Sequence, residues 1–471
     1  MKPNVTMRPI LLWILVNIYP PFLMGQVQEI RDLSLSSAVE LALKNYPAVR
    51  AAKAHAGAAD AGIELARTSY LPKIDLLWQE NRATRNNVFG LLLPQSTIPS
   101  ISGPVLGTTA LGDSAWGSAG GMLVSWEPFD FGLRKANLQQ ARALKIKASA
   151  EVEATRLDAA ASAADLFLVL AGAEAAARSA QANVDRTLVF SRAVHALVDN
   201  QLRPGADASR SDADLAAARN DLIQAQLNVE NARASLAESL GLAGADITIA
   251  SNSLPDLPAG LQLAEAKPEE HPLAEVQKAV IETVRAREQA AASSYFPHFN
   301  YQFALFGRGS GALVDGRIDP GKGPFPEVAN WATGLSISFS AFDLFAIHAR
   351  RRAERENEAA ETARQDQVIQ SLKTQEVRAR AALHATQQIA GNTPIRLQAA
   401  QETHTRSRAR YEAGLGTVVE VADAQRLLAQ AEAENAVAKL SVWRALLAGA
   451  RARGDIRPFL EQAGRTTAGR R

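Results

Sequence analysis

Two carboxylates, Glu420 and Asp423, follow a glycine-containing turn in the stretch YEAGLGTVVEVADAQRLLAQAEAENAVAKL, which runs from Tyr411 to Leu440. Thr417 stands three residues before Glu420, and this capping-box spacing predicts that Glu420 binds a backbone N–H at the start of a helix. Asp423, one turn later, would complement the helix dipole. Acidic side chains can also line a channel, where rings of carboxylates attract cations and repel anions. The spacing alone favours the capping role.

Other site chemistry is largely excluded. The chain has no cysteine, which rules out disulfides, thiol catalysis, cysteine metal sites and lipidation of an N-terminal cysteine. Its seven histidines are scattered without metal-ligand spacing. No phosphate-binding loop or nucleophile motif occurs. We therefore predict no enzyme, no cofactor and no metal. The net charge of +2, from 51 basic and 49 acidic residues, predicts no nucleic-acid partner.

The first residues of the chain predict a secretory signal peptide over residues 1–25. Lys2 gives a basic start, and the apolar stretch that follows is broken by Pro20 and Pro21 before the small residue Gly25. A helical membrane anchor is the alternative, which the short, proline-broken run disfavours. After this segment we find no run of the ~18 apolar residues that a membrane-spanning helix needs.

The chain contains two internal repeats. The stretch NYPAVRAAKAHAGAADAGIELARTSYLPKIDL corresponds to EHPLAEVQKAVIETVRAREQAAASSYFPHFNY, and Pro47 and Pro272 are as far apart as Pro72 and Pro297. In each half the first proline suits the first position of a helix and the second proline ends that helix. The predicted domains are a first repeat over residues 26–241, an equatorial linker over 242–271, a second repeat over 272–454, and a basic tail over 455–471 that we expect to be disordered.

After the second proline of each half, the hydrophobic period becomes that of a β-strand. Phe299, Tyr301 and Phe303, for example, alternate with smaller or polar residues. The pattern predicts four strands in two hairpins, at about residues 72–131 and 297–343. Alternating segments of about ten residues are typical of a transmembrane β-barrel. A half-buried soluble sheet alternates similarly and is the commoner explanation for a single strand, but these hairpins are the only non-helical blocks of an otherwise helical, exported chain.

Long helices are predicted after each hairpin, over residues 133–203 and 344–411, with a local distortion at Pro394. The two shorter helices of a half, placed end to end, fall a little short of its long helix. We therefore expect them to stack along it and to leave a waist, covered by residues 35–45 and 252–272.

Four strands cannot close a barrel by themselves, and open sheet edges are not tolerated in lipid. The smallest closed barrels have about eight strands, so this chain must share a barrel with other copies; counting does not decide between two copies and three. The helices carry narrow, alanine-rich apolar seams, as at Leu157, Ala161 and Ala164. Such helices favour a wall with a wet face over a solid bundle.

The sequence resembles the TolC family of outer-membrane channel proteins. The resemblance lies in the doubled layout, in the stretch LSLSSAVELALKNYPAVRAA, in the pair SYLPKIDL and SYFPHFNY, and in the stretch RYEAGLGTVVEVADAQRLLAQAEAENAVAKLSVWRALLA. The resemblance implies a fold that is mainly α with transmembrane β: a homotrimer with a twelve-stranded β-barrel in the cell outer membrane, four strands per chain. A long periplasmic α-helical barrel would continue from it. The implied function is the exit duct of a tripartite efflux pump or type I secretion system. Its partners would be a periplasmic adaptor (membrane fusion) protein, an inner-membrane transporter and outer membrane lipid.

The resemblance also suggests roles for residues near the helix turns. Glu420 and Asp423 match paired acidic residues at the periplasmic entrance. The family's latching arginine is replaced by Gly416, and its partner aspartate falls at Ser211, so we expect a looser closed state or other locking pairs. The candidate latch residues are Tyr411, Ser211, Asp212 and Asp214. The tips expected to face the adaptor are Pro204, Gly205, Ala206, Ala413, Gly414 and Leu415, although glycines there permit a sharp turn with or without a partner.

Two interpretations remain open from the sequence. An exported structural coiled-coil spacer or adhesin, without channel activity, would need sustained Leu, Ile or Val heptads and no alternating hairpins. Arg350-Arg351-Arg352 is either a solvated helix face or a contact with anionic headgroups.

Overall fold

The computed structural model describes residues 29–84, 112–250, 257, 267–313, 315, 317–339 and 342–468. The predicted signal peptide and most of the predicted linker lie outside the described residues. The elements in chain order are β1 (Glu29–Leu33), α1 (Leu35–Asn45), α2 (Pro47–Thr68), β2 (Lys73–Thr84), β3 (Ser114–Trp126), α3 (Leu133–Asp199), α4 (Gly205–Ser239), β4 (Asp246–Ile249), a 3-10 turn (Pro268–Glu270), α5 (Pro272–Ser293), β5 (His298–Ser310), β6 (Val328–Ser338), α6 (Asp343–Glu412), α7 (Val418–Ala452) and α8 (Arg457–Ala468).

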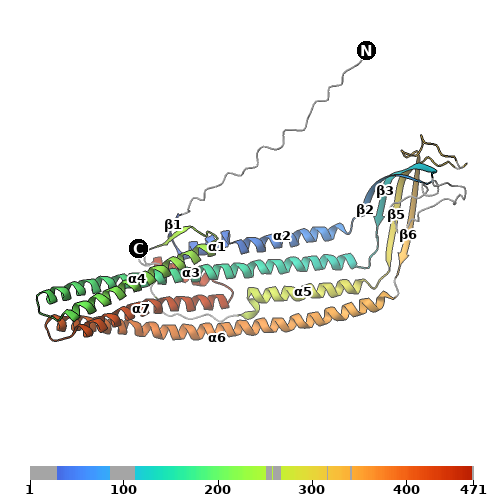
Figure 1. Cartoon of the computed structure of the whole chain (residues 1–471). Helices are drawn as coiled ribbons and strands as arrows, with labels where there is room; N and C mark the ends of the chain where they lie inside the picture. Colours follow the sequence, from blue (N-terminus) through green and yellow to red (C-terminus); the bar gives the residue numbers. More distant parts are fainter. Residues whose placement is uncertain are drawn as a thin grey trace, which may run out of the picture.

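The long helices α3 and α6 organise a helical layer, with the β-sheet at one end and the helix turns at the other (Figure 1). Helices α2 and α4 pack one after the other along α3, and α5 and α7 do the same along α6 while also contacting α3. The predicted end-to-end stacking of the short helices is confirmed. At the waist, β1 and β4 form a small parallel pair.

The helix boundaries follow from their end residues. Pro47 and Pro272 begin α2 and α5, where the first N–H groups of a helix have no intrahelical partner. Helix α6 continues through Pro394, so the distortion expected there does not end the helix. Beside that proline, the Thr393 hydroxyl donates a hydrogen bond of 3.3 Å to Asn435 Oδ1 of α7, which ties the two helices together.

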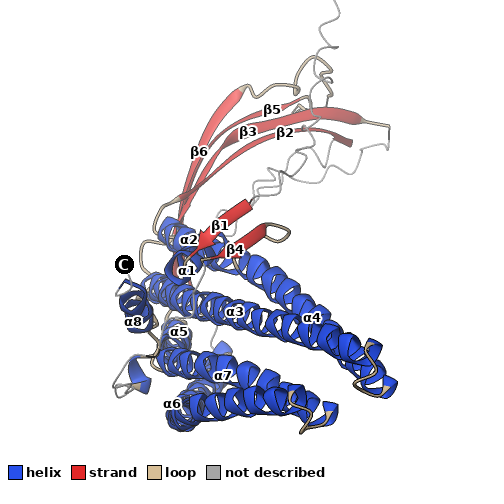
Figure 2. Ribbon diagram, turned by 90° about the vertical axis from the view of Figure 1, so that its left-hand side faces the viewer, coloured by secondary structure: helices blue, strands red, loops and turns tan. Residues whose placement is uncertain are grey.

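Strands β2, β3, β5 and β6 form one antiparallel sheet in that order, with β2 and β6 at its edges (Figure 2). Both predicted hairpins form, as β2–β3 and β5–β6. The two repeats are joined through β3 and β5, where Trp126 lies opposite Tyr301. The sheet is therefore continuous across the repeats but ends at β2 and β6.

The two faces of the sheet carry different side chains. One, which we name the aromatic face, exposes Ile74, Leu76 and Trp78 of β2, and by the strand registers it includes Leu335 and Ile337 of β6. The other, the small-residue face, includes the buried side chains Leu123, Gln302 and Ala304. A Cβ at Gly120 would come within 2.6 Å of the Trp78 ring, so glycine leaves room for the indole on the neighbouring strand.

Two apolar clusters meet on α3 near the waist. One surrounds Trp443 of α7 and the other surrounds Phe167 of α3. By length and composition α3 contains a stretch that could cross a membrane, which corrects the expectation that no such run follows the signal segment. More than half of that stretch is buried, and its alanines contact neighbouring helices. We interpret it as a core helix of the layer.

The prediction of a disordered basic tail was wrong for most of that segment. Residues Arg457–Ala468 form α8. Phe459 packs edge-on against Trp443, with ring centroids 6.0 Å apart, and Ala463 is buried in the same cluster. The prediction relied on the arginine and glycine content of the tail. It overlooked the two apolar side chains, Phe459 and Ala463, which lie one turn apart and anchor the helix.

Candidate channel entrance

The candidate site lies where the two helix pairs turn, at the end of the layer away from the sheet (Figure 1). Both turns depend on a left-handed residue, Gln201 between α3 and α4 and Gly414 between α6 and α7, with φ of 60° and 77°. The Leu415 N–H donates to the Arg410 carbonyl at 2.8 Å, and the Leu202 N–H donates to the Leu197 carbonyl at 2.9 Å. These bonds satisfy carbonyls at the ends of α3 and α6.

Tyr411 joins the two repeats at the tips. Its side chain is only 1% exposed and its ring meets Phe190 of α3 with centroids 5.3 Å apart. The Tyr411 hydroxyl donates to Asp207 Oδ2 of α4 at 3.3 Å. Arg203 lies 4.5 Å above the ring and donates to the Tyr411 carbonyl at 2.8 Å. Burial, with a smaller contribution from the Asp207 carboxylate, raises the pKa of the phenol.

Two of the other candidate latch residues belong to one hydrogen-bonded group between α3 and α4. Asp212 Oδ1 accepts from Ser191 at 3.1 Å and lies 2.8 Å from His195 Nε2. The hydrogen bond from His195 lowers the pKa of the Asp212 carboxyl. Ser211 is buried, and its hydroxyl donates to the Ala208 carbonyl at 2.8 Å. The contacts of Asp212 with Ser191 and His195 hold α3 and α4 of the first repeat together.

Asp214 differs from its neighbours in the latch set. Its side chain is half-buried on α4, and it has no hydrogen bond or ion pair among the residues that the structure describes. Within one chain, Asp214 therefore retains a carboxylate that is available to a group from outside.

Glu420 has part of its predicted capping role. The Thr417 hydroxyl accepts from the Glu420 N–H at 3.2 Å, which confirms Thr417 as the N-cap of α7. The Glu420 carboxylate is directed instead toward Arg410, with Oε2 3.9 Å from Nε, and both side chains are exposed. Among the described residues, the Glu420 carboxylate therefore makes no hydrogen bond to a backbone N–H of the helix start.

Asp423 lies one turn further along α7 and is also exposed. It accepts a hydrogen bond of 3.2 Å from Arg426, which is itself exposed. Val421 and Ala422, between the two carboxylates, are buried against the rest of the chain. Glu420 and Asp423 therefore share the open side of α7.

The predicted tip residues are exposed at both turns. Leu202 and Leu415 are apolar, yet 69% and 72% of their surface is accessible. The full predicted set, Pro204, Gly205, Ala206, Ala413, Gly414 and Leu415, is exposed. The described part of the chain contains no group of histidine or acidic residues that could hold a metal ion.

Several residues of the site were not foreseen from the sequence. Arg203, Asp207 and Phe190 surround Tyr411, and His195 binds Asp212. Each comes from the first repeat, about two hundred positions from Tyr411 or on a separate helix. No local spacing signals such pairs; they follow only from the docking of α3 and α4 beside α6 and α7.

The fold described above, a two-repeat helical layer that ends in an antiparallel sheet, is similar to that of solved outer-membrane channels. The sequence agrees: the family described as outer membrane efflux protein matches residues 38–242 and 265–454. The chain belongs to this family, and its location is the outer membrane. Its relatives are transport proteins rather than enzymes.

Solved structures of outer-membrane channels share the fold. The outer-membrane channel OprN has 22% sequence identity and a TM-score of 0.68, with 89% of each chain covered. CusC has 17% identity and a TM-score of 0.73, covering 93% of this chain and 95% of its own. The open state of MtrE from Neisseria gonorrhoeae has 20% identity and a TM-score of 0.67, covering 92% and 93%. A search of curated protein sequences gives no match.

Proposed function

We propose that three copies of this chain form the exit duct of a tripartite efflux pump or type I secretion system. The observation that carries the proposal is the open four-stranded sheet at the end of the helical layer. Its exposed aromatic face suits lipid, but β2 and β6 each have only one strand partner among the described residues. Open sheet edges of this kind are not stable in lipid until other copies complete a barrel.

Three copies would supply a twelve-stranded barrel, in line with the channel fold, and the helical layers would continue it as an α-helical barrel in the periplasm. Polar and small side chains on the small-residue face suit a water-filled lumen, while Trp78 and Leu76 of the aromatic face suit the lipid side. Passage through such a duct is passive. Energy and selection come from an inner-membrane transporter, joined to the duct by a periplasmic adaptor.

The helix turns form the periplasmic entrance in this proposal. Threefold repetition of Glu420 and Asp423 gives two carboxylate rings that favour cations. The exposed Leu202 and Leu415 fit an adaptor that buries apolar side chains at the tips. Tyr411, Ser211, Asp212 and Asp214 form the latch region, in which Asp214 can pair with a neighbouring copy. The missing arginine at Gly416 favours a weaker closed state.

Fractionation and conductance test the proposal. The protein should be found in the outer membrane as a detergent-requiring, heat-modifiable trimer, and the purified trimer should conduct ions in planar bilayers. A water-soluble rod without conductance would refute the duct and support the spacer.

Charge neutralisation tests the entrance. In the double variant Glu420→Gln/Asp423→Asn, the cation-to-anion permeability ratio should decrease while trimers persist. Asp246→Asn, at an exposed carboxylate of β4 far from the turns, is the matched control and should leave the ratio unchanged. An unchanged ratio in the double variant would remove these two residues from the entrance.

A further inference from the structure

The strand registers repeat between the two halves of the chain. In the first hairpin Lys73 lies opposite Ser125, and in the second His298 lies opposite Ser338. The sequence repeats place Lys73 at the position of His298, just after the helix-ending prolines, and Ser125 at the position of Ser338, four residues before Phe129 and Phe342. The two hairpins are therefore equivalent in register as well as in order.

The pairing of β3 with β5, which connects the two repeats, has no counterpart among the described strands of the chain. Trp126 lies opposite Tyr301 where β3 meets β5. The equivalent positions are Phe339, just after β6, and Leu76 in β2. These strands are the two opposite edges of the sheet, so a single chain cannot bring them together.

We propose that β6 of one copy pairs with β2 of the next in the register that places Phe339 opposite Leu76, and that Lys73 of the next copy completes a corner site at Asp343. This inference rests on the trimer of the proposed function and specifies its contact.

The faces of the sheet support this register. It places Ile337 opposite Trp78 of the next copy, so that two exposed side chains of the aromatic face meet. On the other face it places Ser338 opposite Leu77 and Ser336 opposite Gln79 of the next copy. A slip by one residue would put aromatic side chains on the luminal face.

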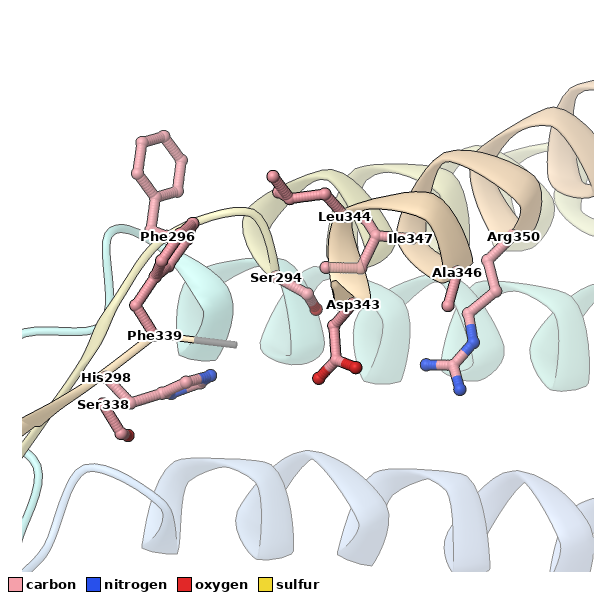
Figure 3. Close-up of a pocket in the computed structure, with 10 residues that line it drawn as sticks. All are labelled: Ser294, Phe296, His298, Ser338, Phe339, Asp343, Leu344, Ala346, Ile347 and Arg350. Atoms are coloured by element: carbon pink, nitrogen blue, oxygen red, sulfur yellow. The ribbon is translucent and has the colours of Figure 1, made fainter. Parts of the chain in front are cut away.

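A cavity of about 230 Å³ lies at the corner between β6 and α6 (Figure 3). Asp343 projects into it from the first turn of α6, and His298, Ser338 and Phe339 line its sheet end. Arg350 lies further along the same side of α6. The Asp343 carboxylate has no hydrogen bond or ion pair with the residues that the structure describes.

The corresponding corner of the first repeat is filled. There Asp130 Oδ2 accepts the Arg134 backbone N–H at 2.5 Å and lies 3.6 Å from the guanidinium of the same arginine. Arg134 is only 8% exposed. In the second repeat the position of Arg134 is taken by Ile347, so Asp343 loses the cation that its counterpart Asp130 has.

The repeating sheet supplies a replacement cation. Across the β3–β5 join, His298 Nδ1 lies 2.8 Å from Glu127 Oε1 at the same corner. Lys73 occupies the position of His298 in the first repeat, and its ammonium is exposed, with Asp75 as its ion-pair partner at 3.3 Å. In the proposed register Lys73 of the next copy lies opposite Phe342, the residue before Asp343, so its ammonium would stand beside the Asp343 carboxylate. Charge complementarity of this kind sets register and partner more than affinity.

Disulfide trapping tests the register cleanly, because the chain has no cysteine of its own. The double variant Ser338→Cys/Leu77→Cys should form covalent dimers and trimers on mild oxidation, since opposed strand residues fall within the span of a disulfide. The matched control, Ser336→Cys/Leu77→Cys, is displaced by two residues and lies beyond that span. Its cross-linking should be at least ~10-fold weaker. Preferential cross-linking of the control would overturn the register.

Charge exchange tests the corner. Lys73→Glu and Asp343→Lys should each lower the temperature at which the trimer dissociates in detergent, because each places like charges together. The combined variant Lys73→Glu/Asp343→Lys should recover most of the loss. Absence of recovery would overturn the ion pair.

The outcomes separate this inference from the proposed function. A trimer that conducts but cross-links only in the displaced register retains the duct and refutes the contact. Absence of any trimer refutes both.

Discussion

Tyr411 is the residue through which the second repeat is anchored to the first at the tips. Its ring, hydroxyl and carbonyl each contact a different side chain, Phe190, Asp207 and Arg203. A single buried aromatic residue with partners on α3, on α4 and in the turn between them couples the two turns mechanically. Movement of one turn at the entrance must therefore either disturb this cluster or carry the other turn with it.

We expect Tyr411→Ala to destabilise the tips by about 3–5 kcal/mol, the usual cost of removing a large buried ring. Tyr411→Phe loses only the hydroxyl contact, at about 0.5–1.5 kcal/mol. Hydrogen exchange of the amides in the two turns would measure both effects. Equal exchange in the two variants would show that packing of the ring contributes nothing.

Asp212 should make the stability of the α3–α4 tip depend on pH. Its pKa is lowered in the folded protein by the hydrogen bond from His195. The stability that the ionised Asp212 adds to the tip is therefore fully present above the ordinary aspartate pKa of about 3.9. It is lost as the pH falls through the lowered pKa of the folded protein. Asp212→Asn should remove this acid dependence from hydrogen exchange of the tip. A variant that keeps the wild-type acid profile would assign the dependence to another carboxyl.

At the scale of elements, much of the fold follows from local rules. The prolines at 47 and 272 begin helices, the period changes after Pro72 and Pro297, and Thr417 caps α7, all as predicted from spacing. The tail was mispredicted because charge and glycine content dominate its composition. Its order depends on Phe459 reaching Trp443, a contact that no local pattern reveals. The partners of Tyr411 escaped prediction for the same reason.

We expect Phe459→Ala to release α8 from the waist, at a cost of about 3–5 kcal/mol in the stability of that docking. Limited proteolysis should then cut the chain between α7 and α8. Arg457→Ala is the control, because Arg457 is exposed and its ion pair with Asp455 is screened by solvent. Cleavage of both variants alike would mean that α8 is held by something other than the aromatic contact.

For the whole molecule, the proposed entrance combines exposed carboxylates with nearby arginines. Arg410 and Arg426 partly offset Glu420 and Asp423 within each chain. The field at the entrance is therefore short-ranged and sensitive to screening by salt. The charge preference of the duct is a property of the assembled ring and cannot be read from one copy.

We expect the cation preference of the conducting trimer to decrease steeply between 0.1 M and 1 M salt, because the screening length shortens from about 10 Å to about 3 Å. Reversal potentials measured across matched salt gradients would show this. A preference that stays constant with ionic strength would place the selectivity in a narrow, desolvated constriction instead.

The edge strands β2 and β6, each with one strand partner among the described residues, have a consequence before any trimer assembles. In a newly made copy, the outer edges of β2 and β6 would lie next to exposed tryptophan and leucine. An open sheet edge is a template for pairing with the wrong strand. When synthesis is faster than trimer assembly, we therefore expect aggregates that are sensitive to proteases. Cells that make this chain in quantity should need a chaperone that keeps the unassembled copies apart.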